Sequence, residues 1–382
     1  MVELYDRSDI SADRLFTMSA SSSMGRRRRI QQKTPSEEQL SISKQSLPTD
    51  VHADQCNRSP SPSFFPTTSS IPELEKKICS KIPKMSSWAW HSIPFHSLPD
   101  WLKDNEFLLH NHRPPMYSFR GCVKSIFRLH TETFNIWTHL LGALFFIMLV
   151  AGVYIFGDYI TFLFEDIQIH NLPLQEQATL LCFFGGAVLC LACSAIYHTF
   201  SNHSKGVHGI LSRLDYTGIS FLITGGSVPT YYYGFYCTTY AKYAYIVVSL
   251  CLGTLCVCVS MWKKFATPKF RTLRFAVFVL LGLYAVIPFV HIFVRDGYIV
   301  STNAYSLWGF VLMGTVNIFG ASLYVMRIPE RFFPGKFDIW ASSHQLFHVC
   351  VVMAALVHYN SLLTMITYRL NVGSCVESLN SI

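Results

Sequence analysis

Seven long apolar runs constrain what this 382-residue chain can fold into. Each run is close to the roughly 20 residues that a helix needs to cross the hydrocarbon core of a membrane. Charged residues make up only 14% of the chain, against about 25% in a typical soluble domain. We therefore predict an all-α membrane protein, a seven-transmembrane helix bundle. The runs are residues 134–156, 177–200, 214–233, 240–262, 275–294, 305–326 and 341–364.

Two of these runs contain residues that weaken helices. Gly225, Gly226 and Pro229 interrupt the third run, and Pro288 interrupts the fifth. Glycine and proline are tolerated in membrane helices because neighbouring helices and local adjustments satisfy the freed backbone groups. We therefore keep both runs as spans, and they are the least regular of the seven.

Basic residues alternate between the loops that join the runs. They cluster before the first run and in the second, fourth and sixth loops, whereas the first loop has none and the third and fifth hold only Lys242 and Arg295. Cytoplasmic loops carry an excess of Lys and Arg, so the amino terminus is predicted to be cytoplasmic and the carboxyl terminus extracellular. The formal charge of +8 is then explained by basic loops at the inner membrane surface, and no nucleic-acid partner is expected.

The chain outside the bundle divides by composition. Residues 1–85 are rich in serine, with 16 in the first 80, and are predicted to be a disordered cytoplasmic tail because they offer too little apolar surface to bury. Residues 86–130 are predicted to be a cytoplasmic juxtamembrane segment with a short interfacial helix that begins near Asp100. Residues 131–367 would form the transmembrane domain and residues 368–382 a short extracellular tail.

Most of the twelve cysteines lie inside the apolar runs. There we expect them to pack as small apolar side chains. Cys190 and Cys193 form a CxxC pair, but they lie among leucines on a predicted membrane helix. We therefore expect neither a redox nor a metal role for that pair.

Three histidines are candidates for a metal site. His344 and His348 are four residues apart at the start of the last run, which places them on one face of a helix, about 6 Å apart along its axis. His198 ends the second run, and the predicted topology brings it to the same inner depth. Three neutral imidazoles with one open position are typical of a catalytic zinc site, whose metal would acidify water toward pH 7.

Two further polar residues lie at the same predicted depth. Asp215 begins the third run and could orient that water or accept its proton. Ser194 lies one helical turn before His198 and could hydrogen-bond the water or a substrate oxygen. Ionisable groups inside a membrane are costly, so such a set indicates a functional site.

Other interpretations of these histidines remain open. A histidine at a helix end is often an interface residue, and His139 in the first run is a rival ligand because it also lies in the inner half. His291 and His358 are nearer the outer half and are excluded. Cations that favour carboxylates, such as magnesium, fit this donor set poorly.

Several stretches around these residues resemble signature blocks of the progestin and adipoQ receptor family. These are residues 135–142, 194–198, 214–218 and 343–348. Residues 99–105, 118–120, 124–128 and 327–340 are similar to the adiponectin receptors in particular. The resemblance covers about residues 98–368, and Phe134 stands where close relatives carry glycine.

The resemblance implies seven helices with the amino terminus inside, Zn2+ held by His198, His344 and His348, water near Asp215, and Ser194 close by. It also implies a hormone-type receptor in the cell membrane that governs lipid, fatty-acid and glucose metabolism. The expected partners are an extracellular adiponectin-like protein hormone or co-receptor and membrane lipids such as ceramide or free fatty acid. A weak ceramidase activity is attributed to the family.

Two functions therefore compete. In the first, the intramembrane zinc site of a receptor hydrolyses a lipid amide such as ceramide. In the second, the zinc is a structural clamp in a receptor or membrane-lipid-homeostasis scaffold without chemistry. A channel or transporter is a third possibility, but inverted repeats and paired charged helices are not evident in the sequence.

Overall fold

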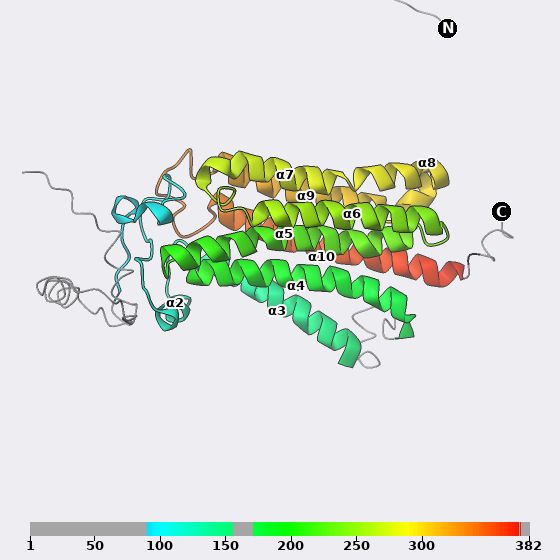
Figure 1. Cartoon of the computed structure of the whole chain (residues 1–382), viewed down its shortest axis with the longest axis horizontal. Helices are drawn as coiled ribbons and strands as arrows, with labels where there is room; N and C mark the ends of the chain where they lie inside the picture. The colour runs from blue at the N-terminus through cyan, green and yellow to red at the C-terminus, as the bar shows by residue number, and fades with distance from the viewer. Residues whose placement is uncertain (1–89, 156–170, 374, 376–382) are drawn as a thin grey trace, which may run out of the picture. The chain divides into compact units, whose positions relative to one another are not determined.

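The computed structural model describes residues 90–155, 171–373 and 375. These residues lie in one compact unit that begins at Pro83, and within them the regular elements are all helices, with one isolated bridge between Ile93 and His112. Figure 1 shows the long helices running side by side. The α-helices are α2 Phe119–Ser125, α3 Thr133–Ile155, α4 Leu174–Phe200, α5 Lys205–Gly234, α6 Thr239–Ser260, α7 Arg271–Leu283, α8 Val286–Asn303, α9 Leu307–Met326 and α10 Ser343–Val372.

Six stretches of the described residues are helices long and apolar enough to cross a membrane. They are α3, α4, α6, the stretch Pro268–Asn303 that contains α7 and α8, α9 and α10. The third predicted run, residues 214–233, is not among these six stretches and lies in α5, a 30-residue helix. Its first turns contain Lys205, Arg213 and Asp215, which lie before or at the start of the predicted run.

Proline explains the break between α7 and α8. Pro288 lies in the first turn of α8, where its missing amide hydrogen costs nothing. Its ring clashes with the carbonyl four residues earlier, at Tyr284, directly after the last residue of α7. Pro229 lies inside α5 without ending that helix.

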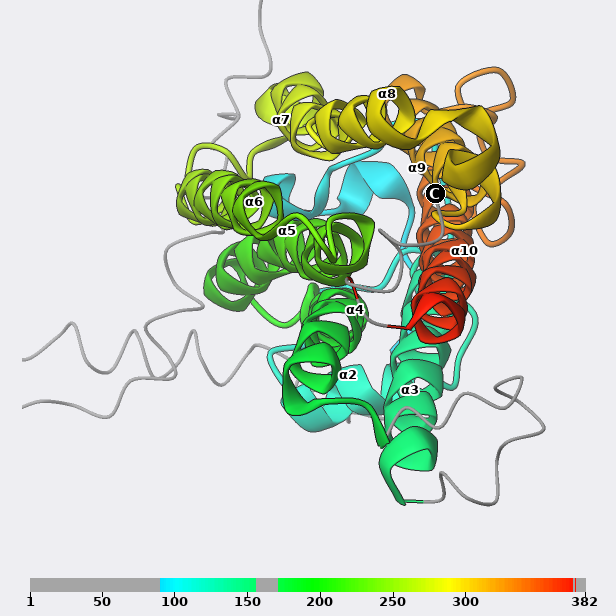
Figure 2. The same cartoon turned by 90° about the vertical axis from the view of Figure 1, so that its right-hand side faces the viewer.

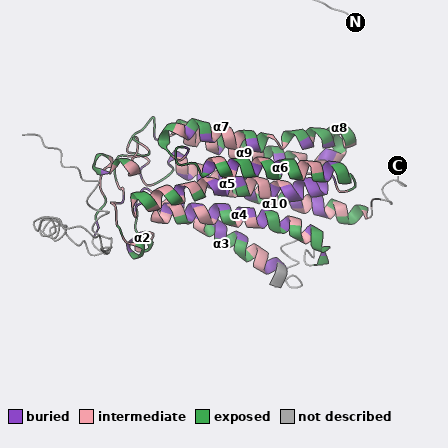
Figure 3. Ribbon diagram, viewed as in Figure 1, coloured by how far each residue is buried: buried purple, intermediate pink, exposed green. Residues whose placement is uncertain are grey.

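Burial differs strongly among the helices. Half of the apolar window of α4 is buried, against 11% of the window of α9. Figure 3 shows this pattern, with buried residues concentrated on α4, α5 and α10. The exposed apolar surface of α7, α8 and α9 is the kind of surface that lipid would cover.

Helices α4 and α5 approach each other closely through glycines. A Cβ on Gly186 of α4 would lie 2.4 Å from the carbonyl oxygen of Phe221 in α5. A Cβ on Gly225 of α5 would lie 2.4 Å from the carbonyl oxygen of Cys182 in α4. Small residues allow such approach of helix backbones in membranes, so these glycines set the distance between the two helices.

The predicted interfacial helix beginning near Asp100 is a single 3-10 turn, Asp100–Leu102. The chain after it is held in an irregular path by the loop between α9 and α10. Asp338 of that loop accepts hydrogen bonds from the backbone N–H groups of Leu109 and His110 at 2.9 and 2.8 Å. These tertiary hydrogen bonds replace the ones that a helix would have made.

A disulfide between Cys237 and Cys375 was not predicted from the sequence. Cys237 follows α5 and Cys375 follows α10. The bond therefore ties the last turns of these two helices together at the end of the bundle where α10 ends. Figure 2 views the molecule from the side on which the chain ends.

Candidate metal centre

The structure brings His198, His344 and His348 together. One ligand atom from each lies within 4.8 Å of the others. The ring of His198 is 5.0 Å from that of His344 and 4.8 Å from that of His348, between centroids. The three residues come from the last turn of α4 and the first two turns of α10, as the depth argument predicts.

Capping contacts fix where α10 begins and therefore where its histidines point. Ser342 is the N-cap, and its side chain and that of Gln345 form a capping box with each other's backbone. Glu330 accepts hydrogen bonds from the backbone N–H of Ser343 at 2.8 Å and from the Ser343 hydroxyl. His344 follows as the second residue of the helix, and His348 lies one turn further on.

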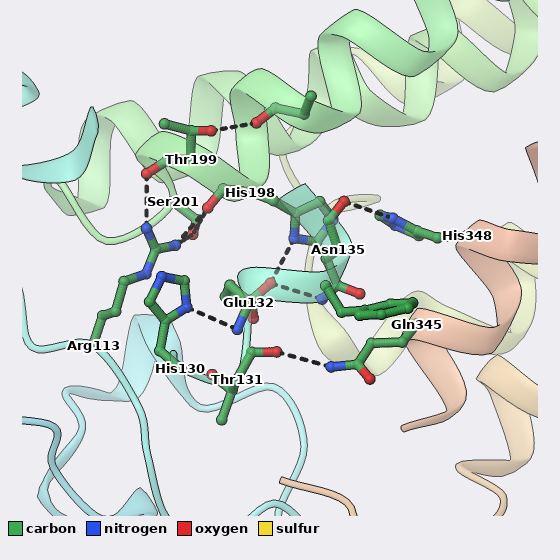
Figure 4. A network of polar contacts seen from close by, with 12 residues as sticks. Arg113, His130, Thr131, Glu132, Asn135, His198, Thr199, Ser201, Gln345 and His348 are labelled. Carbon is green, nitrogen blue, oxygen red and sulfur yellow. Dashed lines mark hydrogen bonds and ion pairs between the residues drawn. The ribbon is translucent and has the colours of Figure 1, made fainter. Parts of the chain in front are cut away.

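In two of the three imidazoles, Nδ1 makes a hydrogen bond to another part of the protein. His198 Nδ1 donates to Glu132 Oε2 at 2.7 Å, and His348 Nδ1 donates to the backbone carbonyl of Asn135 at 3.1 Å. Figure 4 shows both contacts. His198 Nε2 is buried without a hydrogen-bond partner. Metal-binding histidines have this arrangement, so the group of three could hold a metal ion.

Glu132 is a site residue that the sequence analysis missed. It directly precedes α3, and besides His198 it accepts a hydrogen bond from Asn135 Nδ2 at 2.8 Å. Burial alone would raise the pKa of Glu132, but the hydrogen bonds from His198 and Asn135 and the charge of Arg113 hold it below its usual range. The only signal in the sequence is a lone acidic residue next to the first apolar run.

Asp215 and Ser194 also lie near the histidines. Ser194 is buried one turn before His198, and the half-buried carboxylate of Asp215 lies within electrostatic range of His198. Asp215 lies on α5, and its part in the site stays a prediction. The guanidinium of Arg274 also lies within electrostatic range of this carboxylate.

The remaining histidines separate into different environments. His139 stacks on His348, with ring centroids 3.6 Å apart, but it does not belong to the group of three. His358 contacts Thr230 Oγ1 at 3.1 Å, and His291 contacts the hydroxyl of Tyr245 at 3.0 Å. Neither is part of the three-histidine group.

A cavity of about 60 Å³ adjoins the group on the side where α10 begins. Its lining includes His344, Glu132, Asn135, Asp104 and Arg271. The cavity is polar and large enough for ordered water. Water can therefore reach the edge of the histidine group from this side.

Comparison with known proteins gives consistent matches over the helical region. The haemolysin-III-related family matches residues 127–359, which include all three histidines. The adiponectin receptor protein of Drosophila melanogaster is 45% identical over 301 residues, covering 79% of this chain and 65% of the relative. Progestin and adipoQ receptor-like protein 1 of Caenorhabditis elegans is 46% identical over 282 residues, covering 74% and 62%.

A plant relative extends the match to nearly its own full length. Heptahelical transmembrane protein 1 of Arabidopsis thaliana is 33% identical over 281 residues, covering 74% of this chain and 83% of the relative. The chain thus spans somewhat less than two thirds of the two animal relatives and most of the plant one. Together with the site geometry, these matches show that the chain belongs to the haemolysin-III-related family of progestin and adipoQ receptors.

Proposed function

We propose that this chain is an adiponectin-receptor-like receptor of the cell membrane with an intramembrane zinc site that hydrolyses ceramide-type lipid amides. The observation that carries the proposal is the group of His198, His344 and His348, which offers three imidazoles and, among the residues that the structure describes, includes no fourth protein ligand. A closed structural site would normally have four protein ligands. As a receptor, it would regulate lipid, fatty-acid and glucose metabolism in response to an adiponectin-like hormone.

The chemistry divides between the metal and the chain's own residues. Zinc bound at this site would act as a Lewis acid and bring the pKa of water toward 7. Asp215 would accept the proton of the attacking water. Ser194 would hydrogen-bond the water or the oxygen of the substrate carbonyl. Glu132 and Asn135 would hold the imidazoles of His198 and His348 in the tautomer that presents Nε2.

The proposed topology has seven spans, with α5 as the third, and a cytoplasmic amino terminus. Basic residues between α6 and α7 and between α9 and α10 support this orientation. The disulfide supports it independently, because disulfides persist outside the cytosol. Cys237 and Cys375 lie at the end of the bundle that the orientation places outside.

The test combines metal content with lipid hydrolysis in the same detergent-purified samples of the full chain. We expect wild-type protein to contain stoichiometric zinc and to hydrolyse a long-chain ceramide. The double variant His344→Ala, His348→Ala should lose both. His291→Ala is the matched control, because His291 is exposed and lies outside the group. Equal zinc in the double variant and the control would refute the site.

The alternative is a receptor or lipid-homeostasis scaffold in which zinc only clamps helices together. The contacts favour it in one respect, since the three histidines join the end of α4 to the start of α10. Zinc would then be lost from the double variant with a fall in thermal stability. Ceramide hydrolysis at the background rate in every sample, with or without a chelator, would favour this alternative.

A further inference from the structure

We infer that Glu132 and Arg113 are positioning residues of the metal centre, through which the segment before α3 controls metal binding. We call residues 104–132 the lead-in segment. The inference rests on the proposed metal site and goes beyond it, because neither residue would contact the metal. Both instead hold His198, one at its ring and the other at its backbone.

Arg113 holds the end of α4. Its guanidinium donates to the backbone carbonyls of His198 and Thr199, the latter at 3.0 Å, and to Ser125 Oγ at 3.0 Å. The last carbonyls of a helix have no partner within the helix, and they carry partial negative charge that favours a cation. Arg113 is only 3% exposed. A buried cation therefore satisfies the last backbone carbonyls of the helical turn that carries His198.

Glu132 holds the ring of the same residue. Its carboxylate accepts from His198 Nδ1 at 2.7 Å and can only accept, so the remaining ring nitrogen, Nε2, is free of a proton when the imidazole is neutral. Glu132 and Arg113 belong to one segment and lie 66 and 85 residues from His198 in sequence. The lead-in segment therefore fixes both the position and the tautomer of this ligand.

The same segment is also tied to the start of α10. Asn105 Nδ2 donates to Glu330 Oε1 at 2.9 Å, and Glu330 accepts from Ser343, the first residue of α10. The lead-in segment thus contacts both helix ends that carry the histidines. Displacing it would loosen the metal centre without any change in the ligands themselves.

A purely structural role for Glu132 would give a different result from a positioning role. Glu132→Gln has nearly the same shape and can still accept a hydrogen bond through its amide oxygen, but it lacks the charge that strengthens the bond to His198. If Glu132 only supports the fold, the variant should bind metal as the wild type does. If it positions the ligand, metal affinity should fall even where the metal-free protein is equally stable.

The experiment measures zinc affinity by chelator competition on the detergent-purified full chain. We expect Glu132→Gln to weaken zinc binding and Glu132→Ala to weaken it about 10–100-fold, as for other outer partners of metal-binding histidines. Arg113→Lys should weaken it as well, because lysine cannot bridge two carbonyls with a rigid fork. Glu106→Gln is the matched control, since Glu106 lies in the same segment but pairs with Arg327.

A second readout separates positioning from folding. The visible absorption of cobalt(II) bound at the site reports ligand geometry, and we expect it to change in Glu132→Gln but not in Glu106→Gln. Wild-type affinity and an unchanged cobalt spectrum in Glu132→Gln would overturn the inference. If the wild type itself bound neither zinc nor cobalt, the proposed metal site would fail first.

Discussion

At the residue scale, a buried histidine can bind a ligand only if one of its two ring nitrogens lacks a partner in the protein. His130 is fully buried, and both of its nitrogens are used: Nε2 contacts the Ser125 carbonyl at 3.1 Å, and Nδ1 accepts from the Glu132 N–H at 3.1 Å. His198 lies nearby with Nε2 unpartnered. The first histidine is therefore a structural link, whereas the second can bind a ligand.

Asp215→Asn should retain zinc and lose activity, because asparagine keeps the shape of the side chain but cannot accept a proton. General-base assistance is typically worth about 10²–10⁴-fold, so ceramide hydrolysis should fall at least about tenfold. Zinc content and hydrolysis are measured in one preparation. Unchanged hydrolysis in this variant would remove Asp215 from the mechanism.

His130 should make the protein less stable in mild acid. Burial lowers its pKa from 6.5 to about 3, so the folded protein disfavours the proton that the unfolded chain accepts. This contribution is complete above about pH 6.5 and is lost as pH falls toward 3, by about 2 kcal/mol at pH 5. His130→Gln should therefore show a smaller drop in melting temperature between pH 7 and pH 5 than the wild type. Equal drops in the two proteins would contradict this prediction.

At the element scale, α4 is the centre of the arrangement. It carries His198 at its end, packs along α5 through glycines, and has the largest buried share among the candidate spans. Helices in lipid gain little from the hydrophobic effect when they associate, so close packing carries more of the stability. The spacing between α4 and α5 also sets how near Asp215 lies to His198.

Gly186→Ala should destabilise the bundle, because its Cβ would meet the Phe221 carbonyl oxygen at 2.4 Å. Overpacking of this kind typically costs about 1–3 kcal/mol. The adjacent Gly185→Ala is the control, since its Cβ meets nothing within 4 Å. Thermal unfolding in detergent compares the two variants, and we expect a lower melting temperature only for Gly186→Ala. Equal melting temperatures would show that the backbones separate without cost.

The sequence predicts some elements well and others poorly, for physical reasons. Hydropathy locates six helices because length and apolar composition are local properties, and the spacing of His344 and His348 predicts their shared face. Cys237 and Cys375 are 138 residues apart in the sequence, and nothing in the sequence near either cysteine indicates that the two pair. Glu132 was not predicted as a site residue, because charged residues next to the apolar runs were used only to predict the orientation of the bundle in the membrane. The short helix expected near Asp100 is a single 3-10 turn, Asp100–Leu102, and Asp338 binds the backbone that follows it.

At the scale of the whole molecule, the two ends of the bundle differ in chemistry. The end that carries the three histidines also holds the lead-in segment and its ion pairs, such as Arg271 with Asp104 at 2.6 Å. The other end holds the disulfide and a buried Glu176 that pairs with Arg369 at 3.2 Å. Each end is thus fastened by its own polar contacts.

Epitope tags test the proposed orientation of these ends. On intact cells, a tag at the carboxyl terminus should be stained and one at the amino terminus should not, because the basic loops favour the cytoplasm. Permeabilised cells provide the control, in which both tags should be stained. Staining of the amino-terminal tag on intact cells would reverse the topology.

Removing residues 1–80 should leave the metal centre intact. The tail lies outside the described residues, and its composition offers little apolar surface to bury. We expect unchanged zinc content and a melting temperature within error of the full chain. Loss of zinc from the truncated protein would show that the tail supports the site.

The polar character of α5 has a consequence for how the chain is made. Because α5 is not among the six stretches that are apolar enough to cross a membrane, it would partition poorly from the translocon into lipid by itself. Only residues 201–204 separate it from the apolar α4. The two helices would therefore enter the membrane together as a hairpin. Substitutions between them would then lower the yield of inserted protein during synthesis, before any folded molecule exists to be melted.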